Sequence, residues 1–144
     1  MINTAKERKR EMSRAIKFRA WIERKKELLY LKGFRYSGTE KIKITFHDED
    51  HDDCTYTYLK KDVILEQFTG LHDKNGVEIY ENDVVSDGKY HGIIEFWDCS
   101  FVVNWEISCP HDNDLNYWND KIEVIGNIHE SEETHAIRKC SLWM

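Results

Sequence analysis

The chain has 144 residues, a length typical of one domain, and its 40% hydrophobic and 12% aromatic content excludes wholesale disorder. One proline and seven glycines exclude collagen-like and linker-like architectures. The net charge of -6 is divided unevenly, because residues 1–26 hold ten Lys/Arg against three Asp/Glu and the rest of the chain holds eleven against 24. A basic front segment can bind phosphates or an acidic protein surface, so the charge alone selects no partner.

The first half of the chain predicts a basic arm followed by antiparallel strands. Residues 1–12 contain few apolar side chains and predict a short helical arm. Strict alternation over residues 16–22 predicts a strand with one covered face, which leaves Lys17, Arg19 and Trp21 on the other face. Further strands are predicted over residues 27–36, 41–46 and 55–59.

The second half predicts short strands separated by turns. The Asn75-Gly76 pair indicates the clearest turn, because both residue types tolerate a positive φ. Short β-rich runs at roughly ten-residue spacing are typical of a sandwich or a small barrel. Ser131, followed by two glutamates, predicts the N-cap of a terminal helix. Turns are also predicted at 86–89, 98–100 and 110–113, and the last strand at 122–128.

Targeting signals and paired cysteines are both missing from the sequence. Nowhere do eighteen apolar residues run together, and the N-terminus has no hydrophobic stretch, which predicts neither a membrane span nor a secretory signal. We therefore expect a cytoplasmic protein. The four cysteines form no C-x-x-C pair, so reduced structural thiols are expected rather than a zinc ribbon, a redox dithiol or a disulfide framework.

The segment from His47 to Cys54 contains five carboxylates, two histidines and a thiol, all of which are conceivable metal ligands. His47 and His51 are the weak metal candidates. The segment joins two strand-like runs and lacks the ligand order of an EF-hand loop. A solvated acidic loop is the favoured interpretation, so no metal and no other cofactor is predicted. A metal-dependent enzyme that uses this loop stays open as an alternative.

The sequence contains none of three common motifs of catalytic and nucleotide-binding sites. The chain has no G-x-S-x-G, which frames many nucleophilic serines, and neither G-x-G-x-x-G nor a P-loop pattern. Carboxylate pairs can always be chosen from 27 acidic residues, so such a choice has no discriminating power without a pocket. We predict that the protein is not an enzyme.

Cations cluster around Trp21, and a basic strand with an aromatic residue can bind phosphate while it stacks a base. The isoelectric point of about 5.6 is far below that of a dedicated nucleic-acid-binding protein. Binding of nucleic acid and a structural or self-association role for this strand therefore both stay open. The candidate partner-binding residues are Arg14, Lys17, Arg19, Trp21, Arg24, Lys25 and Lys26.

Three strings of the sequence carry a resemblance to a known family. Residues 16–21 read IKFRAW, residues 67–85 read QFTGLHDKNGVEIYENDVV, and residues 123–128 read EVIGNI and are followed by Glu130. These strings resemble the opening strand, the signature and the closing motif of the YopX family, a group of small proteins encoded by phages and prophages of bacteria. The likeness spans residues 13–133. The family often has an asparagine-proline pair where this chain has Ser131-Glu132.

The resemblance implies a mainly β protein of the α+β type, with a small SH3-like or related β-barrel in the C-terminal half. It implies a phage or prophage origin and no established activity. One YopX-like domain would follow the arm at 1–12. Its parts are antiparallel strands over 13–62, the barrel over 63–130 and a helical tail over 131–144.

The signature itself has a physical interpretation as a folding device. Gly70 and Gly76 are expected at turns, and Asp73 is expected to cap the amide groups of the turn. Glu81 and Asp83 are alternatively possible ligand contacts in a groove. The expected core positions are Phe68, Leu71, Ile79, Tyr80, Val84 and Val85.

The sequence therefore predicts a non-enzymatic binding or regulatory module. The expected partners are a second copy of the chain, a phage or host protein, or nucleic acid. A purely structural or assembly component is a further alternative, and no membrane partner is expected.

Overall fold

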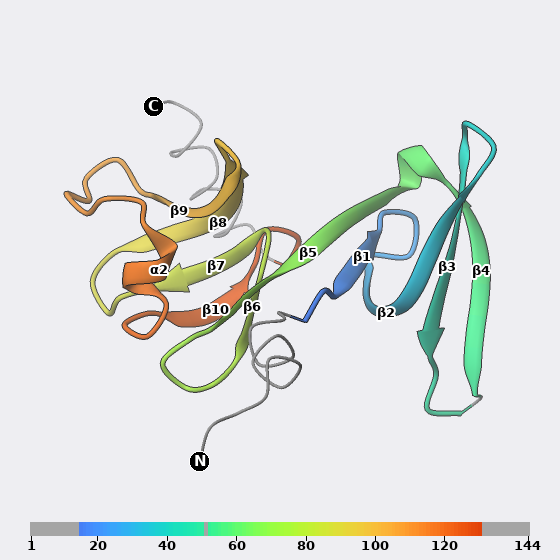
Figure 1. The fold of residues 1–144 in the computed structure, drawn as a ribbon, viewed down its shortest axis with the longest axis horizontal. Coiled ribbons are helices and arrows are strands. Elements are labelled where there is room, and N and C mark those ends of the chain that lie inside the picture. The colour runs from blue at the N-terminus through green and yellow to red at the C-terminus, as the bar shows by residue number, and fades with distance from the viewer. Residues whose placement is uncertain (1–14, 51, 131–144) are drawn as a thin grey trace, which may run out of the picture.

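The computed structural model describes residues 15–50 and 52–130, which fold mainly as antiparallel β-strands. Figure 1 shows two lobes, and we call residues 15–62 the N-terminal lobe and residues 63–130 the C-terminal lobe. The elements are β1 (Phe18–Ile22), β2 (Glu27–Ser37), β3 (Lys41–His47), β4 (Asp53–Leu59), η1 (Lys60–Asp62), β5 (Val63–His72), β6 (Glu78–Tyr80), β7 (Asp83–Ser86), β8 (His91–Trp97), β9 (Ser100–Trp105), α2 (Leu115–Trp118) and β10 (Glu123–Asn127).

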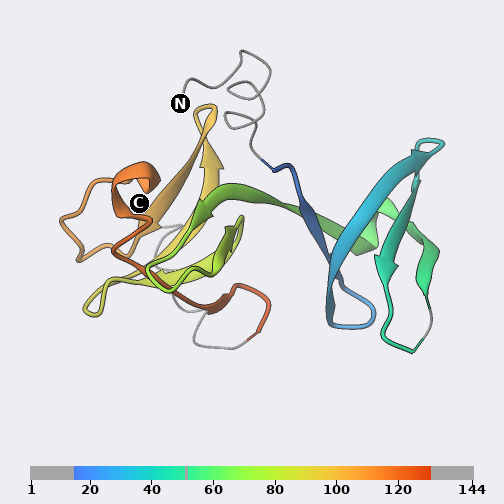
Figure 2. The same cartoon turned by 60° about the horizontal axis from the view of Figure 1, so that its bottom comes forward.

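The strands form two open sheets. A six-stranded sheet has the order β4-β3-β2-β1-β5-β6, and a four-stranded sheet has the order β10-β7-β8-β9. The long strand β5 begins beside the N-terminal lobe, where it pairs with β1, and leads into the rest of the C-terminal lobe in both views (Figures 1 and 2). The lobes are therefore joined through the six-stranded sheet, whose edge strand β6 lies in the C-terminal lobe.

Strand β1 is covered on both faces, so the predicted strand with one covered face is wrong. It pairs with β2 on one side and with β5 on the other, and its last four residues are all buried. Ala20 and Ile22 pack into the core of the N-terminal lobe. Arg19 and Trp21 lie on the other side of β1 and contact residues of the C-terminal lobe. The alternation in the sequence indicates one covered face, and it gives no sign of this second contact.

The C-terminal lobe contains the larger apolar core. Five of the six core positions expected in the signature are buried, and the sixth, Leu71, packs partly buried against the core. The buried residues of the core of the C-terminal lobe are Ile79, Val85, Ile94, Val103, Trp105, Leu115 and Ile122.

The described strands close no barrel, so the expected SH3-like barrel is not confirmed. Strands β9 and β10 are the two edges of the four-stranded sheet. The edge of β9 is instead met by the chain at Asn113 and Asp114, where the Val103 amide donates to the Asn113 carbonyl. Spacing of turns predicts the number of strands, whereas closure depends on the register between distant strands.

The signature turn has the predicted geometry. Asp73 Oδ1 accepts hydrogen bonds from the amides of Asn75 at 2.8 Å and Val77 at 2.9 Å, and its Oδ2 accepts from the amide of Val124. Gly76 has a φ of +81°, which a side chain would strain. Gly70 also has a positive φ, but it lies within β5 where the pairing with β6 shifts register, rather than at a turn.

Helix is limited to the four residues of α2 and to η1 among the described residues. The predicted helical arm over 1–12 and the predicted helix over 131–144 lie outside the described residues. No helix in the described part of the chain is long and apolar enough to cross a membrane.

Candidate functional site

The cations predicted to bind a partner are held by the chain itself. Lys17 pairs with Glu78, and Lys26 pairs with Glu23. Arg24 Nε lies 3.2 Å from Asp62 Oδ2. Lys25 differs from them, because its ammonium lies over the rings of Tyr56 and Tyr58. Arg14 lies outside the described residues.

Arg19 is buried at the junction of the lobes and is not on the surface. Its side chain is only 3% exposed, which removes it from any phosphate-binding face. The Nε atom lies 2.8 Å from Glu66 Oε1, and Nη2 lies 2.7 Å from Asp83 Oδ1. Nη2 also donates to the Glu81 carbonyl at 3.0 Å. The guanidinium thus connects β1 with β5 and β7.

Glu66 extends this ion pair into a buried network. Its Oε2 accepts a hydrogen bond from Asn82 Nδ2 at 2.6 Å and lies 2.8 Å from His129 Nε2. The His129 ring stacks on Trp21 with centroids 4.5 Å apart. We call Arg19, Glu66, Asp83, Asn82 and His129 the junction network. It ties β1 to the segment that follows β10, so the two lobes are held together through polar contacts.

The pKa values of the two carboxylates that face Arg19 shift in opposite directions. Burial alone would raise the pKa of Glu66, but the hydrogen bond from His129 and the charge of Arg19 outweigh it and lower that pKa. Burial raises the pKa of Asp83 to about 6, against the opposing charge of Arg19. Glu66 faces three side-chain donors, which explains why it remains the more acidic of the two.

Glu81 and Asp83, the alternative ligand contacts, both bind their own chain. Asp83 Oδ2 accepts from the Tyr80 amide at 2.8 Å, and Glu81 Oε1 accepts from the Gln67 amide at 2.9 Å. Burial raises the pKa of Glu81, which that amide hydrogen bond opposes. These contacts fit the folding role of the signature.

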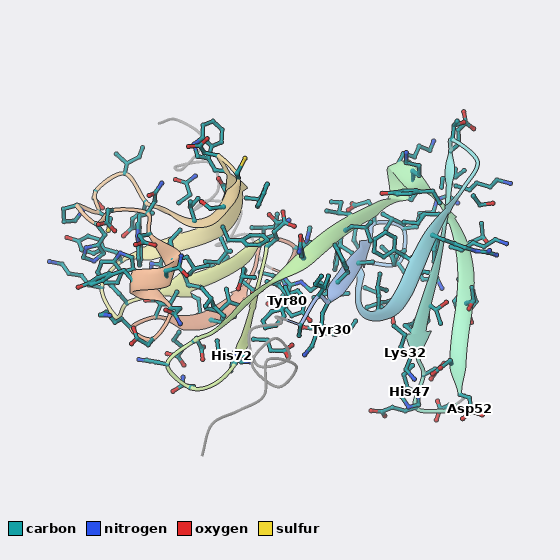
Figure 3. The ribbon with its side chains drawn as sticks, in the orientation of Figure 1. Tyr30, Lys32, His47, Asp52, His72 and Tyr80 are labelled. Carbon is teal, nitrogen blue, oxygen red and sulfur yellow. The ribbon has the colours of Figure 1, made fainter. Side chains whose placement is uncertain are left out.

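The weak metal candidates do not come together as a site in the described residues. His47 is exposed, and its Nδ1 lies 3.5 Å from Asp53 Oδ1, which Lys32 also approaches. Figure 3 places His47 and Asp52 at the tip of the β3–β4 hairpin. His51 lies outside the described residues. Within residues 15–50 and 52–130, no three His, Cys, Asp or Glu side chains are grouped to hold a metal ion.

A surface groove that the sequence did not indicate runs along β9. Its volume is about 430 Å³, and we call it the β9 groove. It lies between the β8–β9 hairpin and the loop that covers the edge of β9. Its lining residues are Glu95, Trp97, Val102, Val103, Asn104, Trp105, Glu106, Cys109, His111 and Asn113.

The β9 groove combines two carboxylates with an exposed indole. Trp97 is 69% exposed, next to the tight turn at Asp98 and Cys99, which both have positive φ. Both Glu95 oxygens lie 3.3 Å from Asn104 Nδ2. In the part of the chain that the structure describes, neither Glu95 nor Glu106 forms an ion pair. The groove thus offers negative charge beside a flat aromatic surface.

Aromatic packing holds the inner wall of the β9 groove rigid. The His111 ring contacts Trp118 at 4.2 Å and Trp105 at 5.1 Å between centroids. His111 Nε2 lies 2.6 Å from Asp87 Oδ2, and Trp105 Nε1 donates to the Asp112 carbonyl at 2.9 Å. These contacts fix both the ring positions and the loop that carries His111.

Cys109 in the groove wall is a poor nucleophile. Burial raises the pKa of its thiol, and the charges of Asp87 and Glu106 raise it further, while a hydrogen bond from the His111 backbone opposes them. A protonated thiol does not attack a substrate, so the nearby Cys109, His111 and Asp87 do not form an activated nucleophile.

A family model described as YopX protein matches residues 17–134. The chain belongs to the YopX family. This confirms the resemblance carried by the opening strand, the signature and the closing motif. No curated protein matches the chain.

Two solved structures are similar to this YopX-family fold. Protein EF1440 from Enterococcus faecalis has 26% sequence identity and a TM-score of 0.52, with 82% of this chain and 96% of that chain covered. Protein yopX from Bacillus subtilis has 17% identity and a TM-score of 0.53 at the same coverage, which shows the likeness of fold alone.

Proposed function

We propose that this YopX-family protein is a non-enzymatic binding module that holds a basic segment of a partner protein in the β9 groove. The observation that carries the proposal is that Glu95 and Glu106 line the groove together with the exposed ring of Trp97, and neither carboxylate forms an ion pair within residues 15–50 and 52–130. A guanidinium can stack on an indole while it pairs with a carboxylate, so arginine fits this chemistry best.

The charge of the C-terminal lobe supports a basic partner. Residues 63–130 contain three Lys/Arg against 14 Asp/Glu. A lobe of this charge attracts cationic segments over several ångströms and repels nucleic acid. The attraction raises the rate of association and lowers the affinity for acidic competitors. The partner would be a protein of the phage or of its bacterial host.

The non-enzymatic character of the module is part of the proposal. Two observations support it. The raised pKa of the Cys109 thiol argues against an activated cysteine nucleophile in the β9 groove. In the junction network, Glu66 and Asp83 both pair with Arg19. A peptide of alternating glycine and arginine offers only its peptide bonds for cleavage, so recovery of the intact peptide after incubation with the protein tests for peptidase activity.

Fluorescence anisotropy tests the groove with a fluorescein-labelled peptide of alternating glycine and arginine. We expect binding by the full chain, and a loss of roughly tenfold in affinity in Trp97→Ala and in the Glu95→Gln, Glu106→Gln double variant. Glu123→Gln on β10, the opposite edge of the same sheet, is the matched control and retains binding. Equal losses in the control and the groove variants, or no binding by any of them, would overturn the proposal.

A further inference from the structure

The N-terminal lobe carries exposed tyrosines on one face of its sheet. Tyr36 is 56% exposed and Tyr56 is 46% exposed, although both lie on strands beside buried isoleucines. In the register, Tyr36 and Tyr58 flank Ile42, and Tyr56 lies opposite Ile44. Residues that lie opposite one another in an antiparallel sheet point to the same face, so the three rings share one side.

Two lysines lie over these rings. Lys25 Nζ is 5.2 Å from the Tyr56 centroid and 5.7 Å from the Tyr58 centroid, and Lys60 Nζ is 4.8 Å from the Tyr36 centroid. Neither lysine forms an ion pair with a carboxylate in the described residues. We call Tyr36, Tyr56, Tyr58, Lys25 and Lys60 the tyrosine-lysine face.

The acidic residues of the N-terminal lobe are concentrated away from the β2–β3 turn. The lobe contains eleven Lys/Arg against nine Asp/Glu, and five of those nine lie within residues 48–53. Figure 3 shows this tip, marked by His47 and Asp52, at the far end of the hairpin from the β2–β3 turn. Tyr36 and Lys60 lie at the less acidic end, next to that turn.

Two further cations lie at this end of the lobe, on the opposite side of its sheet from the tyrosine-lysine face. Arg35 lies directly opposite Lys43 across β2 and β3, on the reverse side of the sheet. Like charges in directly opposed positions destabilise a sheet, and no ion pair offsets this one among the described residues. An anion bound near this end of the lobe would offset the repulsion.

We propose that the tyrosine-lysine face binds single-stranded nucleic acid. The exposed rings of Tyr36 and Tyr56 would stack on bases, beside the half-buried ring of Tyr58. Lys25 and Lys60 would contact the phosphates of the stacked nucleotides. An unpaired strand fits because its bases are free to stack on a side chain, whereas the bases of a duplex are already stacked on one another. This site is separate from the β9 groove and requires no part of it.

Anisotropy of a fluorescein-labelled 20-nucleotide oligothymidine tests the face in the full chain. We expect a Kd in the micromolar range at low salt, with log Kd rising at a slope of roughly 1.4 against log salt for two neutralised phosphates. The slope should fall by roughly 0.7 in Lys60→Ala. We expect the Tyr36→Ala, Tyr56→Ala double variant to bind at least about tenfold more weakly.

The chain provides a matched control on the other lobe. Tyr117 is 54% exposed, and Lys121 Nζ lies 4.1 Å from its ring centroid, so Tyr117→Ala and Lys121→Ala remove an equivalent pair from the C-terminal lobe. Both control variants should bind the oligonucleotide as the unmodified chain does. The Tyr36→Phe, Tyr56→Phe double variant should also retain binding, because a phenyl ring still stacks. This result separates lost stacking from lost folding.

Two results would overturn the proposal. One is the absence of an anisotropy change with roughly 100 μM protein at low salt, since non-specific binding is measurable in that range. The other is an equal loss of affinity in the Tyr117→Ala control. Oligonucleotide binding that survives the tyrosine double variant would assign the attraction to the cations alone and would also overturn it.

Discussion

The two lobes use the same antiparallel strands but bury them to different extents. In the C-terminal lobe, seven buried residues that include Trp105 form one core. In the N-terminal lobe, β4 has no buried residue and β2 has one, Leu29. Apolar packing is therefore more extensive in the C-terminal lobe, whereas the N-terminal lobe keeps more sheet surface exposed around a smaller core.

The two lobes also differ in net charge. The C-terminal lobe is strongly acidic, while the N-terminal lobe carries most of the lysines and arginines of the described chain. The junction network lies where the two meet. A buried ion pair adds little stability relative to apolar packing, so we infer that the junction network fixes how the lobes are joined.

The largest expected effect comes from removing the centre of the junction network. Arg19→Met leaves Glu66 and Asp83 buried without their cation, and we expect a loss of about 3–5 kcal/mol in the free energy of unfolding. Urea unfolding measures this loss. The exposed ion pair of Lys26 gives the control, because Lys26→Met should cost about 0.5 kcal/mol or less. Similar losses in both variants would contradict a role for the network in joining the lobes.

A second prediction compares glycines in strands of the two lobes. A Cβ added at Gly92 in β8 would lie 2.6 Å from Val103 Cγ1, whereas one added at Gly33 in β2 meets no atom within 4 Å. We expect Gly92→Ala to cost about 1–3 kcal/mol through overpacking. Gly33→Ala should change stability by about 0.5 kcal/mol or less. Thermal unfolding of both variants checks the difference in packing, and equal midpoints would contradict it.

The smallest expected stability effect depends on pH. The Asp83 pKa of about 6 in the folded chain lies above its ordinary value of 3.8, so the folded state binds this proton more tightly than the unfolded state. The stability that protonated Asp83 contributes is complete below pH 3.8 and is lost as the pH rises through 6. We expect a loss of about 1 kcal/mol from this group between pH 5 and pH 7.

Urea unfolding at pH 5 and pH 7 measures that loss, with Asp83→Asn as the reference. All groups other than Asp83 are the same in both proteins, so their contributions to the pH dependence cancel in the comparison. The unmodified chain should lose about 1 kcal/mol more than the variant over this interval. Glu66 has a lowered pKa and titrates below its ordinary value of 4.5, outside the interval. The same pH dependence in the two proteins would contradict an Asp83 pKa of about 6.

The sequence predicted those features of the fold that depend on neighbouring residues. The turn at Asn75-Gly76, its cap by Asp73 and the strands over 27–36 and 41–46 follow from local conformational preference and alternation. The burial of Arg19 could not be predicted in this way. It depends on Glu66 and Asp83, which are 47 and 64 positions further along the chain and reach Arg19 only when the lobes join.

The two proposed binding sites could not be predicted from local sequence patterns for the same reason. Glu95, Glu106 and Trp97 become one groove because β9 is an edge strand that a loop partly covers. Tyr36, Tyr56 and Tyr58 share a face only in the observed register of β2, β3 and β4. The cations around Trp21 were visible in the sequence, but their carboxylate partners were not.

The division of binding between the lobes is tested most directly by measuring both labelled probes on the same preparation of Trp97→Ala. The account predicts that this variant loses affinity for the Gly-Arg peptide while its Kd for oligothymidine equals that of the unmodified chain. A loss of both affinities together would contradict two separate sites.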